Sequence, residues 1–503
     1  MQLDSIEPCV TEAPPLPPPP PPDAEELAAQ PKRHWTPLGN SWCLVRTFGD
    51  AFFRFIVETG LWIVWASGRW RQDTANIRMH RMCKATLAHM LKHPDCSPDL
   101  LPDYKKWIKR SETGPMFEQM LLLARSDRNI AISFNQLDQH PDYLCCEDWV
   151  VDLRTGERFP NRPDLYLIKN TNVPYVPDAA FQPLEAFLDE ITGGNRAIRN
   201  FIQALFGYTL QGSTKEEKLF ILHGPGGTGK STVLEAVSGA SGEYHVAAAF
   251  STFLKKDRVS SGPSEDIARL AGARLITASE VDDGQRFAEG TLKQLTGGDA
   301  VSARFLYQNS FDFRMTGKLV IACNHLPFMQ TDDNAIWRRV VRVPCEQLPS
   351  QLQTNLKSLF ATPEAKIAIL AWMVKGAAEW YRNGLVIPQE IQTATACARE
   401  EMDPVAAFIS EECITDPRCL NGVTQFRKSY EVWAQANGQR YTLDRRRFNR
   451  ALKAKGFEQG VRKVNNAKAR CWLGIHWVGQ NEEQRERIQA ELYRDRNQGL
   501  FKQ

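Results

Sequence analysis

Short apolar runs recur along the middle of the chain. Four of them are LFILH (219–223), RLITAS (274–279), KLVIAC (318–323) and VVRV (340–343). Apolar runs of this length that end at glycine, proline or polar residues are typical of buried strands. We therefore predict an α/β core over residues 215–345.

Longer periodic patterns flank this core. Residues 181–211 predict two amphipathic helices broken at Gly193 and Gly194, and helices fill most of 350–400. Nearer the N-terminus, LVRTFGDAFFRFIV (44–57) has apolar positions at helical spacing. Two hairpins follow it, LWIVWASGRWRQD turning at Ser67 and Gly68 and DWVVDLRTGERFP turning at Thr155 and Gly156.

These patterns divide the chain into seven parts. The fold class that we predict is α/β, with an N-terminal α+β domain before the core and a small basic domain after it. The predicted parts are a Pro-rich tether (1–34), the N-terminal α+β domain (35–180), a helical collar-like segment (181–214), the core (215–345), a helical segment (346–402), the basic domain (403–480) and a charged helix (481–503).

Charge is distributed unevenly along the chain. The whole sequence carries a formal net charge of +3, but residues 418–478 hold fourteen basic and three acidic residues, a net charge of +11. Such an asymmetry favours a C-terminal module that faces nucleic acid. The alternative is a solvated helix face.

The cysteines and the apolar segments indicate a reduced, water-soluble protein. The twelve cysteines include no CxxC pair, so we interpret them as packed thiols of a cytosolic protein. Residues 52–68 are interrupted by Arg54 and Glu58 and are too short and too charged to span a bilayer, so we expect no membrane partner. The polyproline run at 14–22 predicts an extended linker, with a proline-motif binding role as the alternative.

The chemistry begins directly after the first apolar run. The stretch HGPGGTGKST satisfies GxxxxGK[ST], whose backbone amides surround phosphate oxygens. A chance glycine turn is the alternative, but it leaves the strand before and the helix after unexplained. The motif predicts that ATP is bound by Gly224, Pro225, Gly226, Gly227, Thr228, Gly229, Lys230, Ser231 and Thr232, with Lys230 on the β/γ-phosphates and Ser231 on Mg²⁺.

Polar residues end the next two strands. Glu280 follows RLITAS and is our first candidate for the Mg²⁺ shell or for polarising water, assisted by Asp282 or Asp283. Asn324 follows KLVIAC and can hydrogen-bond a γ-phosphate or an attacking water. Ordinary surface acids and a turn-forming asparagine are the alternatives.

Two adjacent arginines, Arg338 and Arg339, precede the last strand. A guanidinium is costly to bury without an anionic partner. We expect at least one of the two to reach a neighbouring subunit's ATP as an arginine finger, and the other to pair with Asp332 or Asp333. Local ion pairs for both arginines are the alternative.

Taken together, these motifs resemble those of the superfamily 3 helicases, and more closely the helicase part of the phage/plasmid and poxvirus-type primase-helicases. The resemblance spans about residues 38–478. The stretches that carry it are GDAFFRFIVETGLWIVWASGRWRQD, VVDLRTGERFPNRPDLYLIK, FIQALFGYTLQG, HGPGGTGKST, RLITASE, LKQLTGGDAVSARFLYQNSFDF, KLVIACNHLP, IWRRVVRVP and DPVAAFI.

The resemblance implies an AAA+-like P-loop core that forms a homo-oligomeric ring, usually a hexamer, and translocates on single-stranded or forked DNA. It also implies that Glu280, Asn324 and one of the arginines complete ATP hydrolysis. DNA contacts would come from Lys293, Arg304, Gln308 and Asn309, with structural roles for Lys293 and Arg304 as the alternative. Family members that carry a primase domain have it before this part; we expect priming, where it occurs, from another polypeptide.

The basic domain fits a winged helix, with two helices and a wing hairpin. Its candidate DNA contacts are Arg445, Arg446, Arg447, Arg450, Lys453 and Arg462. The sequence thus predicts an ATP-driven DNA helicase that replicates a phage, prophage or plasmid in the bacterial cytoplasm. Alternatives are an origin-binding initiator that melts DNA locally, a small-molecule kinase and a non-enzymatic DNA-binding regulator.

Overall fold

The computed structural model describes most of the chain after residue 34. The described residues are 35–255, 265–279, 285–304, 310–327, 329, 334–348, 355–401, 403–437, 442–464, 467–479, 483, 486–488 and 490. Two compact units divide between residues 134 and 135. In this described part, no helix is long and apolar enough to cross a membrane.

The first unit packs helices on a small mixed sheet of order β3-β2-β1-β4. A core rich in Trp, Phe and Met holds the two layers together. The elements are α2 (Pro37–Leu44), a π-helix (Val45–Gly49), α3 (Asp50–Phe52), β1 (Phe53–Ile56), β2 (Leu61–Ala66), β3 (Arg69–Gln72), α4 (Ile77–Lys92), α5 (Leu101–Ser111), α6 (Gly114–Ala124) and β4 (Ala131–Ile132).

The helical prediction for residues 44–57 is wrong in its second half. Residues 53–56 form β1, all four of them buried, and Phe53 pairs with Val64 of β2 in an antiparallel register. A short apolar run does not by itself distinguish a buried helix from a strand, and here pairing with β2 decides. The hairpin that turns at Ser67 and Gly68 is confirmed as β2–β3.

The second unit begins earlier than the predicted boundary at residue 180. A three-stranded antiparallel sheet, β5 (Tyr143–Cys145), β6 (Val150–Asp152) and β7 (Arg158–Phe159), belongs to it. Leu144 and Val151 share one apolar cluster with the helices α7 (Gln182–Ile191) and α8 (Arg196–Leu210). Burial of these strands against the helices therefore fixes the boundary.

A five-stranded sheet forms the centre of the second unit, and all its neighbouring strands run parallel. Its order is β14-β8-β13-β10-β9. The strands are β8 (Leu219–His223), β9 (His245–Ala247), β10 (Leu275–Ser279), β13 (Lys318–Cys323) and β14 (Val340–Pro344), so the four predicted apolar strands are confirmed.

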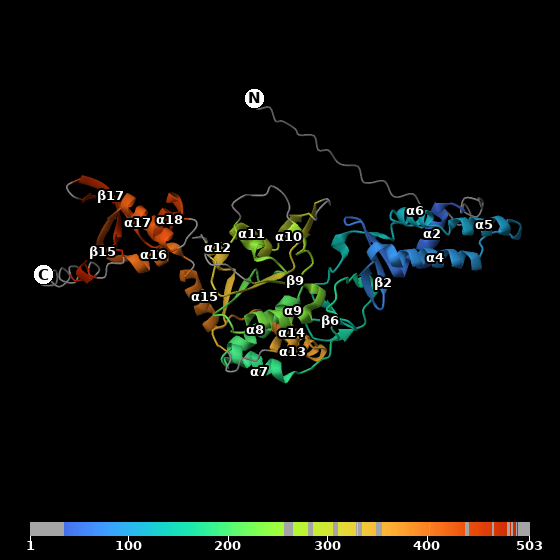
Figure 1. The fold of residues 1–503 in the computed structure, drawn as a ribbon, viewed down its shortest axis with the longest axis horizontal. Coiled ribbons are helices and arrows are strands. Elements are labelled where there is room, and N and C mark those ends of the chain that lie inside the picture. Colours follow the sequence, from blue (N-terminus) through green and yellow to red (C-terminus); the bar gives the residue numbers. More distant parts are fainter. Residues whose placement is uncertain are drawn as a thin grey trace, which may run out of the picture. The chain divides into compact units, whose positions relative to one another are not determined.

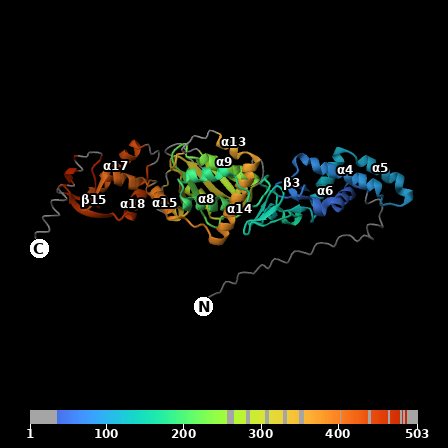
Figure 2. The ribbon, with the colours of Figure 1, turned by 90° about the horizontal axis from the view of Figure 1, so that it is seen from below.

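Alternate residues of each strand enter two different apolar clusters, because successive side chains of a strand point to opposite faces. Phe220 and Leu222 pack with α8, α9 (Lys230–Ser241) and α14 (Pro363–Asn383). Leu219 and Ile221 pack with α10 (Glu265–Ala268), α11 (Glu289–Thr296) and α12 (Asn334–Trp337). Figure 1 shows these two groups of helices on opposite sides of the strands, and Figure 2 gives the view from below.

Two buried cations fasten α8 to the sheet. Arg274, just before β10, donates to the carbonyl oxygens of Leu210 (2.7 Å) and Tyr143 (2.8 Å). Lys318, the first residue of β13, donates to the carbonyl oxygen of Gln211. Burial lowers the pKa of Lys318 well below its usual value. These cations cap the carbonyl end of α8, which needs donors that the helix cannot supply.

The basic domain predicted over residues 403–480, called the basic module from here on, ends the second unit. Its sheet has the order β15-β17-β16, and an aromatic core packs the helices against it. The elements from α13 onward are α13 (Leu356–Phe360), α14, α15 (Gln389–Glu401), α16 (Pro404–Glu412), β15 (Cys413–Gly422), α17 (Val423–Ala436), α18 (Arg445–Ala454), β16 (Glu458–Val464) and β17 (Ala467–Trp477). The predicted pair of helices and the hairpin after them are confirmed.

The cysteines of the described part are free thiols, as predicted, and eight of these eleven are buried. Burial raises the pKa of several of them, for example of Cys345 to about 12. A thiol with so high a pKa is unreactive at neutral pH.

Candidate nucleotide and nucleic-acid sites

The loop between β8 and α9 is built from glycines that other residues could not replace. Gly224, Gly227 and Gly229 have φ values of 157°, 85° and 85°. A Cβ on Gly224 would lie 1.9 Å from the carbonyl oxygen of Cys345, which follows the neighbouring strand β14. The close approach of two backbones and the positive φ angles explain why these positions are glycine.

Lys230 begins α9 and folds back into this loop. Its Nζ donates to the carbonyl oxygens of Gly224 (2.7 Å) and Pro225 (2.6 Å) and contacts Oγ1 of Thr228 at 3.2 Å. The side chain is 6% exposed, and burial lowers its pKa. Three oxygens thus hold an ammonium group at the N-terminus of a helix, where backbone amides also favour an anion.

The remaining loop residues leave this site open to solvent. Pro225, Gly226 and Gly227 are exposed, and so is Ser231 on the first turn of α9, whereas Thr232 is partly buried. Thr228 is buried and donates to the carbonyl oxygen of Pro225 (3.0 Å). The loop can therefore surround a phosphate group, with the Ser231 hydroxyl within the same turn of α9.

The next two strands of the sheet, β13 and β10, end level with this loop. Cys323 at the end of β13 pairs with His223, and Ser279 at the end of β10 pairs with Ala322. Asn324, which is exposed, therefore leaves the sheet directly beside the glycine loop. Glu280 is the residue after Ser279, but the predicted acids Glu280, Asp282 and Asp283 lie outside the described residues.

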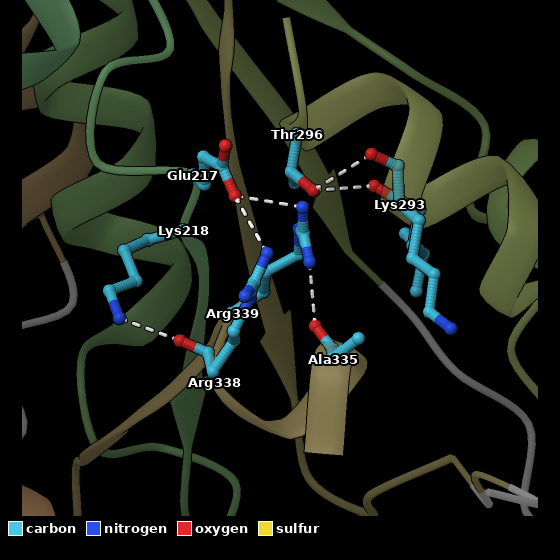
Figure 3. A network of polar contacts seen from close by, with 8 residues as sticks. Glu217, Lys218, Lys293, Thr296, Ala335, Arg338 and Arg339 are labelled. Atoms are coloured by element: carbon cyan, nitrogen blue, oxygen red, sulfur yellow. Dashed lines mark hydrogen bonds and ion pairs between the residues drawn. The ribbon is translucent and has the colours of Figure 1, made fainter. Parts of the chain in front are cut away.

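The two arginines before β14 have different surroundings (Figure 3). The Arg339 side chain is 10% exposed; its Nη2 lies 2.8 Å from Oε2 of Glu217, and its Nη1 donates to the carbonyl oxygen of Ala335 at 2.7 Å. The Arg338 side chain is 65% exposed and lies 3.5 Å from the same carboxylate. Lys218 donates to the carbonyl oxygen of Arg338 (2.6 Å).

The anionic partner in this cluster is Glu217, which the sequence prediction missed. The pairs that we expected with Asp332 or Asp333 fall on residues outside the described part. Glu217 lies more than 120 positions before the arginines and is adjacent to them only because β8 and β14 are neighbours. Its position directly before a predicted strand was the only available signal.

The predicted DNA contacts of the core lie on α11 and on a hairpin. Lys293 is half-buried on α11. Thr296, the last residue of this helix, donates its hydroxyl hydrogen to the carbonyl oxygen of Lys293. The hairpin pairs β11 (Ala300–Ala303) with β12 (Phe311–Arg314), and Arg304 follows β11 with an exposed side chain. Gln308 and Asn309 lie outside the described residues.

The basic module exposes one face of α18. Phe448, Ala451 and Leu452 are buried, and the predicted contact residues on the other face of the helix are exposed. Asp444 caps the helix and accepts from the amides of Arg446 (2.9 Å) and Arg447 (3.0 Å). The exposed cations are Arg445, Arg446, Arg447, Arg450 and Lys453 on α18 and Arg462 on β16.

Comparison with known families finds two matches. Residues 43–193 match the family described as D5 N terminal like, and residues 222–339 match a family of unknown function (DUF5906). The first match covers most of the N-terminal unit and continues into the second unit as far as α7, and the second match contains the glycine loop and both arginines.

The chain is similar to several viral proteins. It is 25% identical over 326 residues to "Putative helicase L207/L206" of Acanthamoeba polyphaga mimivirus, covering 60% of this chain and 34% of that protein. It is 26% identical over 269 residues to "Putative helicase 022R" of Frog virus 3 (49% and 27%) and 23% identical over 332 residues to "Primase D5" of Fowlpox virus (62% and 37%). The chain thus spans about a third of the length of these relatives.

Among solved structures, the chain is similar to the apo structure of the NrS-1 C terminal region. The TM-score is 0.43 at 12% identity, with 88% of this chain and 99% of that chain covered. The match of residues 43–193 to the D5 N terminal like family and the similarity to viral proteins named as helicases and as a primase agree with the resemblance to a D5-type primase-helicase that the motifs indicated.

Proposed function

We propose that this protein is an ATP-dependent DNA helicase with an AAA+-like P-loop core. The observation that carries the proposal is Lys230, a nearly buried ammonium held by the carbonyl oxygens of a glycine loop at the N-terminus of α9. The loop follows β8, which lies between β13 and β14 at the point where the strand order reverses. Open parallel sheets bind ligands in such crevices.

The residues of the loop fit ATP and Mg²⁺. The lowered pKa of Lys230 shows that burial opposes its charge, so phosphate oxygens would be better partners than carbonyl dipoles. Loop amides would orient the phosphates, and the Ser231 hydroxyl and the Glu280 carboxylate would hold Mg²⁺. Mg²⁺ would supply charge neutralisation on the phosphate oxygens.

Hydrolysis needs a polar group beside the phosphates and a cation opposite Lys230. Asn324 leaves the sheet next to the loop and would orient the attacking water, with Glu280 or Asp282 accepting its proton. Arg339 is held by Glu217 and the carbonyl of Ala335, so we assign it a structural role. Arg338 is exposed, and we assign it as the finger that reaches the ATP of a neighbouring subunit in a ring, which we propose is a hexamer.

The basic module supports DNA as the partner. The order α16-β15-α17-α18-β16-β17 with sheet order β15-β17-β16 fits a winged helix, in which α18 would enter the major groove. Its exposed cations would neutralise phosphates, while Lys293, Arg304 and the hairpin β11–β12 would face single-stranded DNA. The relatives named as helicases and as a primase agree with a replication role, which we place in a phage, prophage or plasmid.

A second candidate is an origin-binding initiator. The observation in its favour is the exposed cationic face of α18, which suits sequence reading in a groove as well as phosphate contact. Footprinting on the element's own origin separates the two, because an initiator protects a defined sequence whereas a translocating ring does not.

ATP hydrolysis, measured with and without single-stranded DNA, tests the proposal. Lys230→Ala is the blank, because it removes the ammonium and leaves the loop. Stimulation of the wild-type rate by single strands, together with strand separation on a forked duplex, is the expected result. Hydrolysis that is indifferent to DNA would reject the helicase and favour a kinase or a switch-like ATPase.

A further inference from the structure

A third arginine, Arg342, lies inside β14 and contacts the residue before the glycine loop. Arg342 is 8% exposed. Its Nε and Nη2 lie 3.1 Å and 2.8 Å from Nδ1 of His223, the last residue of β8. Because the guanidinium only donates, Nδ1 is the acceptor and the ring carries its proton on the other nitrogen.

The His223 ring bridges this arginine and the candidate hydrolysis residue Asn324. Asn324 follows Cys323, which pairs with His223 in the neighbouring strand, so its backbone leaves the sheet beside the ring, where a hydrogen bond between the two raises the pKa of His223. The charged groups that face the ring are Arg342 from β14, Lys230 from α9 and His325 after β13. Burial first, and then these cations, lowers the pKa of His223 to about 4, whereas the bond to Asn324 opposes the shift. The ring is therefore neutral at physiological pH.

Arg342 is also bound by α15. Its backbone amide donates to Oγ1 of Thr395 (3.0 Å), and its Nη1 lies 3.4 Å from the carbonyl oxygen of Ala394. Within the part of the chain that the structure describes, its guanidinium forms an ion pair with Glu346 at 3.6 Å, and this carboxylate is 60% exposed and a weak partner. Burying an arginine beside so weak an ionic partner costs free energy of folding. A role in function would explain why an arginine occupies this position.

The same helix reaches the element that carries the candidate finger. Arg399 of α15 donates to Oδ1 of Asn334 (2.6 Å) and lies over the ring of Trp337, 5.7 Å from its centroid. Asn334 and Trp337 are the first and last residues of α12, which ends directly before Arg338. Hence α15 contacts both Arg342, which lies against the residue before the glycine loop, and α12, which precedes the candidate finger. The first helix of the basic module, α16, begins at Pro404, shortly after α15 ends.

We propose that Arg342 is a positioning residue for ATP hydrolysis: through His223 it fixes the backbone of Asn324 beside the glycine loop, and it makes that position depend on α15. The inference rests on the proposed function, because it assigns Arg342 a part in the same reaction. A displacement of α15 would move Arg342 and, with it, the amide group that orients water. The basic module would thus influence hydrolysis through this helix.

Arg342→Met tests this directly, because it keeps an unbranched, apolar side chain in place of the arginine stem and removes the donors of the guanidinium. We expect kcat for ATP to fall roughly 10- to 100-fold, the loss typical of a small displacement of a reacting group, while binding of a fluorescent ATP analogue changes by less than about two-fold. The matched control is Arg382→Met, an exposed arginine that pairs with Glu379 on α14. This control should retain wild-type kcat.

A pair of variants at His223 keeps the test decisive if Arg342→Met does not fold. Glutamine offers both an acceptor and a donor, so His223→Gln should retain kcat within about three-fold. His223→Leu offers neither and should lose as much as Arg342→Met. Folding of each variant is checked by thermal melting, and equal kcat for the glutamine and leucine variants would overturn the proposal.

The pH profile separates positioning from a general loss of packing. In the wild type, His223 stays neutral from pH 8 down to about 5, because its folded pKa is about 4. Replacing Arg342 removes one of the cations that lower this pKa but leaves burial, the first cause, so the pKa should rise part of the way toward its ordinary value and activity should be lost at a higher pH than in the wild type. Arg342→Met should therefore show an acid limb that the double variant with His223→Gln lacks.

The two hypotheses fail in different ways. If the wild type hydrolyses ATP and Arg342→Met keeps its kcat within about two-fold, the positioning role is wrong and the proposed function stands. If the wild type does not hydrolyse ATP at all, both are wrong.

Discussion

Arg338 and Arg339 are adjacent in sequence, yet their replacement should have opposite consequences for stability and for catalysis. Arg339→Ala removes two hydrogen bonds from a side chain that is 10% exposed, whereas Arg338→Ala removes a 3.5 Å ion pair from one that is 65% exposed. We expect the first substitution to destabilise the core and the second to leave its stability unchanged.

The magnitudes follow from these contacts. A hydrogen bond that involves a charged group contributes about 1.5–3 kcal/mol when it is shielded from water. Glu217 is 42% exposed, so its share lies at the lower end after screening by solvent, and we expect about 2–3 kcal/mol in total for Arg339→Ala. Arg338→Ala should cost less than about 0.5 kcal/mol.

Scanning calorimetry measures the difference. Because the chain has two compact units, the relevant transition is the one that added ATP moves to higher temperature. For a cooperative transition that involves roughly 150–250 residues, Arg339→Ala should lower the midpoint by about 4–12 °C and Arg338→Ala by less than about 2 °C. Glu217→Gln, which keeps a neutral acceptor for Arg339, should lie between them.

Equal midpoints for the two arginine variants would refute the assignment of Arg339 as the structural residue. The assignment would also be refuted if Glu217→Gln destabilised the protein more than Arg339→Ala does. If the Arg338→Ala protein is stable and hydrolyses ATP at the wild-type rate, Arg338 takes no part in the reaction.

Three further predictions concern the finger, the loop and the basic module. If Arg338 acts in trans, Arg338→Ala and Lys230→Ala subunits are each inactive alone, but an equal mixture of them should recover about a quarter of the wild-type ATPase rate, because about a quarter of the interfaces then join an intact loop to an intact arginine. No recovery would mean that the arginine does not act between subunits. Gly224→Ala places a Cβ 1.9 Å from a backbone oxygen and should weaken binding of a fluorescent ATP analogue more than about ten-fold, while Gly114→Ala, which meets no atom within 4 Å, should leave it unchanged. Arg450→Ala on the exposed face of α18 should reduce the slope of log affinity for DNA against log salt concentration by about one. Filter binding at several salt concentrations measures this slope, and an unchanged slope would mean that Arg450 does not contact a phosphate.

Local patterns were reliable where one short segment decides its own structure. The four apolar strands, the helices broken at Gly193 and Gly194, and the hairpin at Thr155 and Gly156 all lie where the residue pattern placed them. Patterns failed at residues 53–56, because pairing with β2 overrides helical spacing there. The domain boundary moved for a similar reason, since β5 and β6 are buried against helices that follow them in the chain.

The sequence by itself determined the local structure of the glycine loop, because consecutive residues supply both the glycines that adopt positive φ angles and the lysine at the start of the helix. It also determined the charge of the last module. Only the tertiary structure decided which arginine is buried, that Glu217 is its partner, and that Arg342 reaches Asn324 through His223. Those contacts join residues more than 100 positions apart, and strand order in the sheet, rather than any local pattern, brings them together.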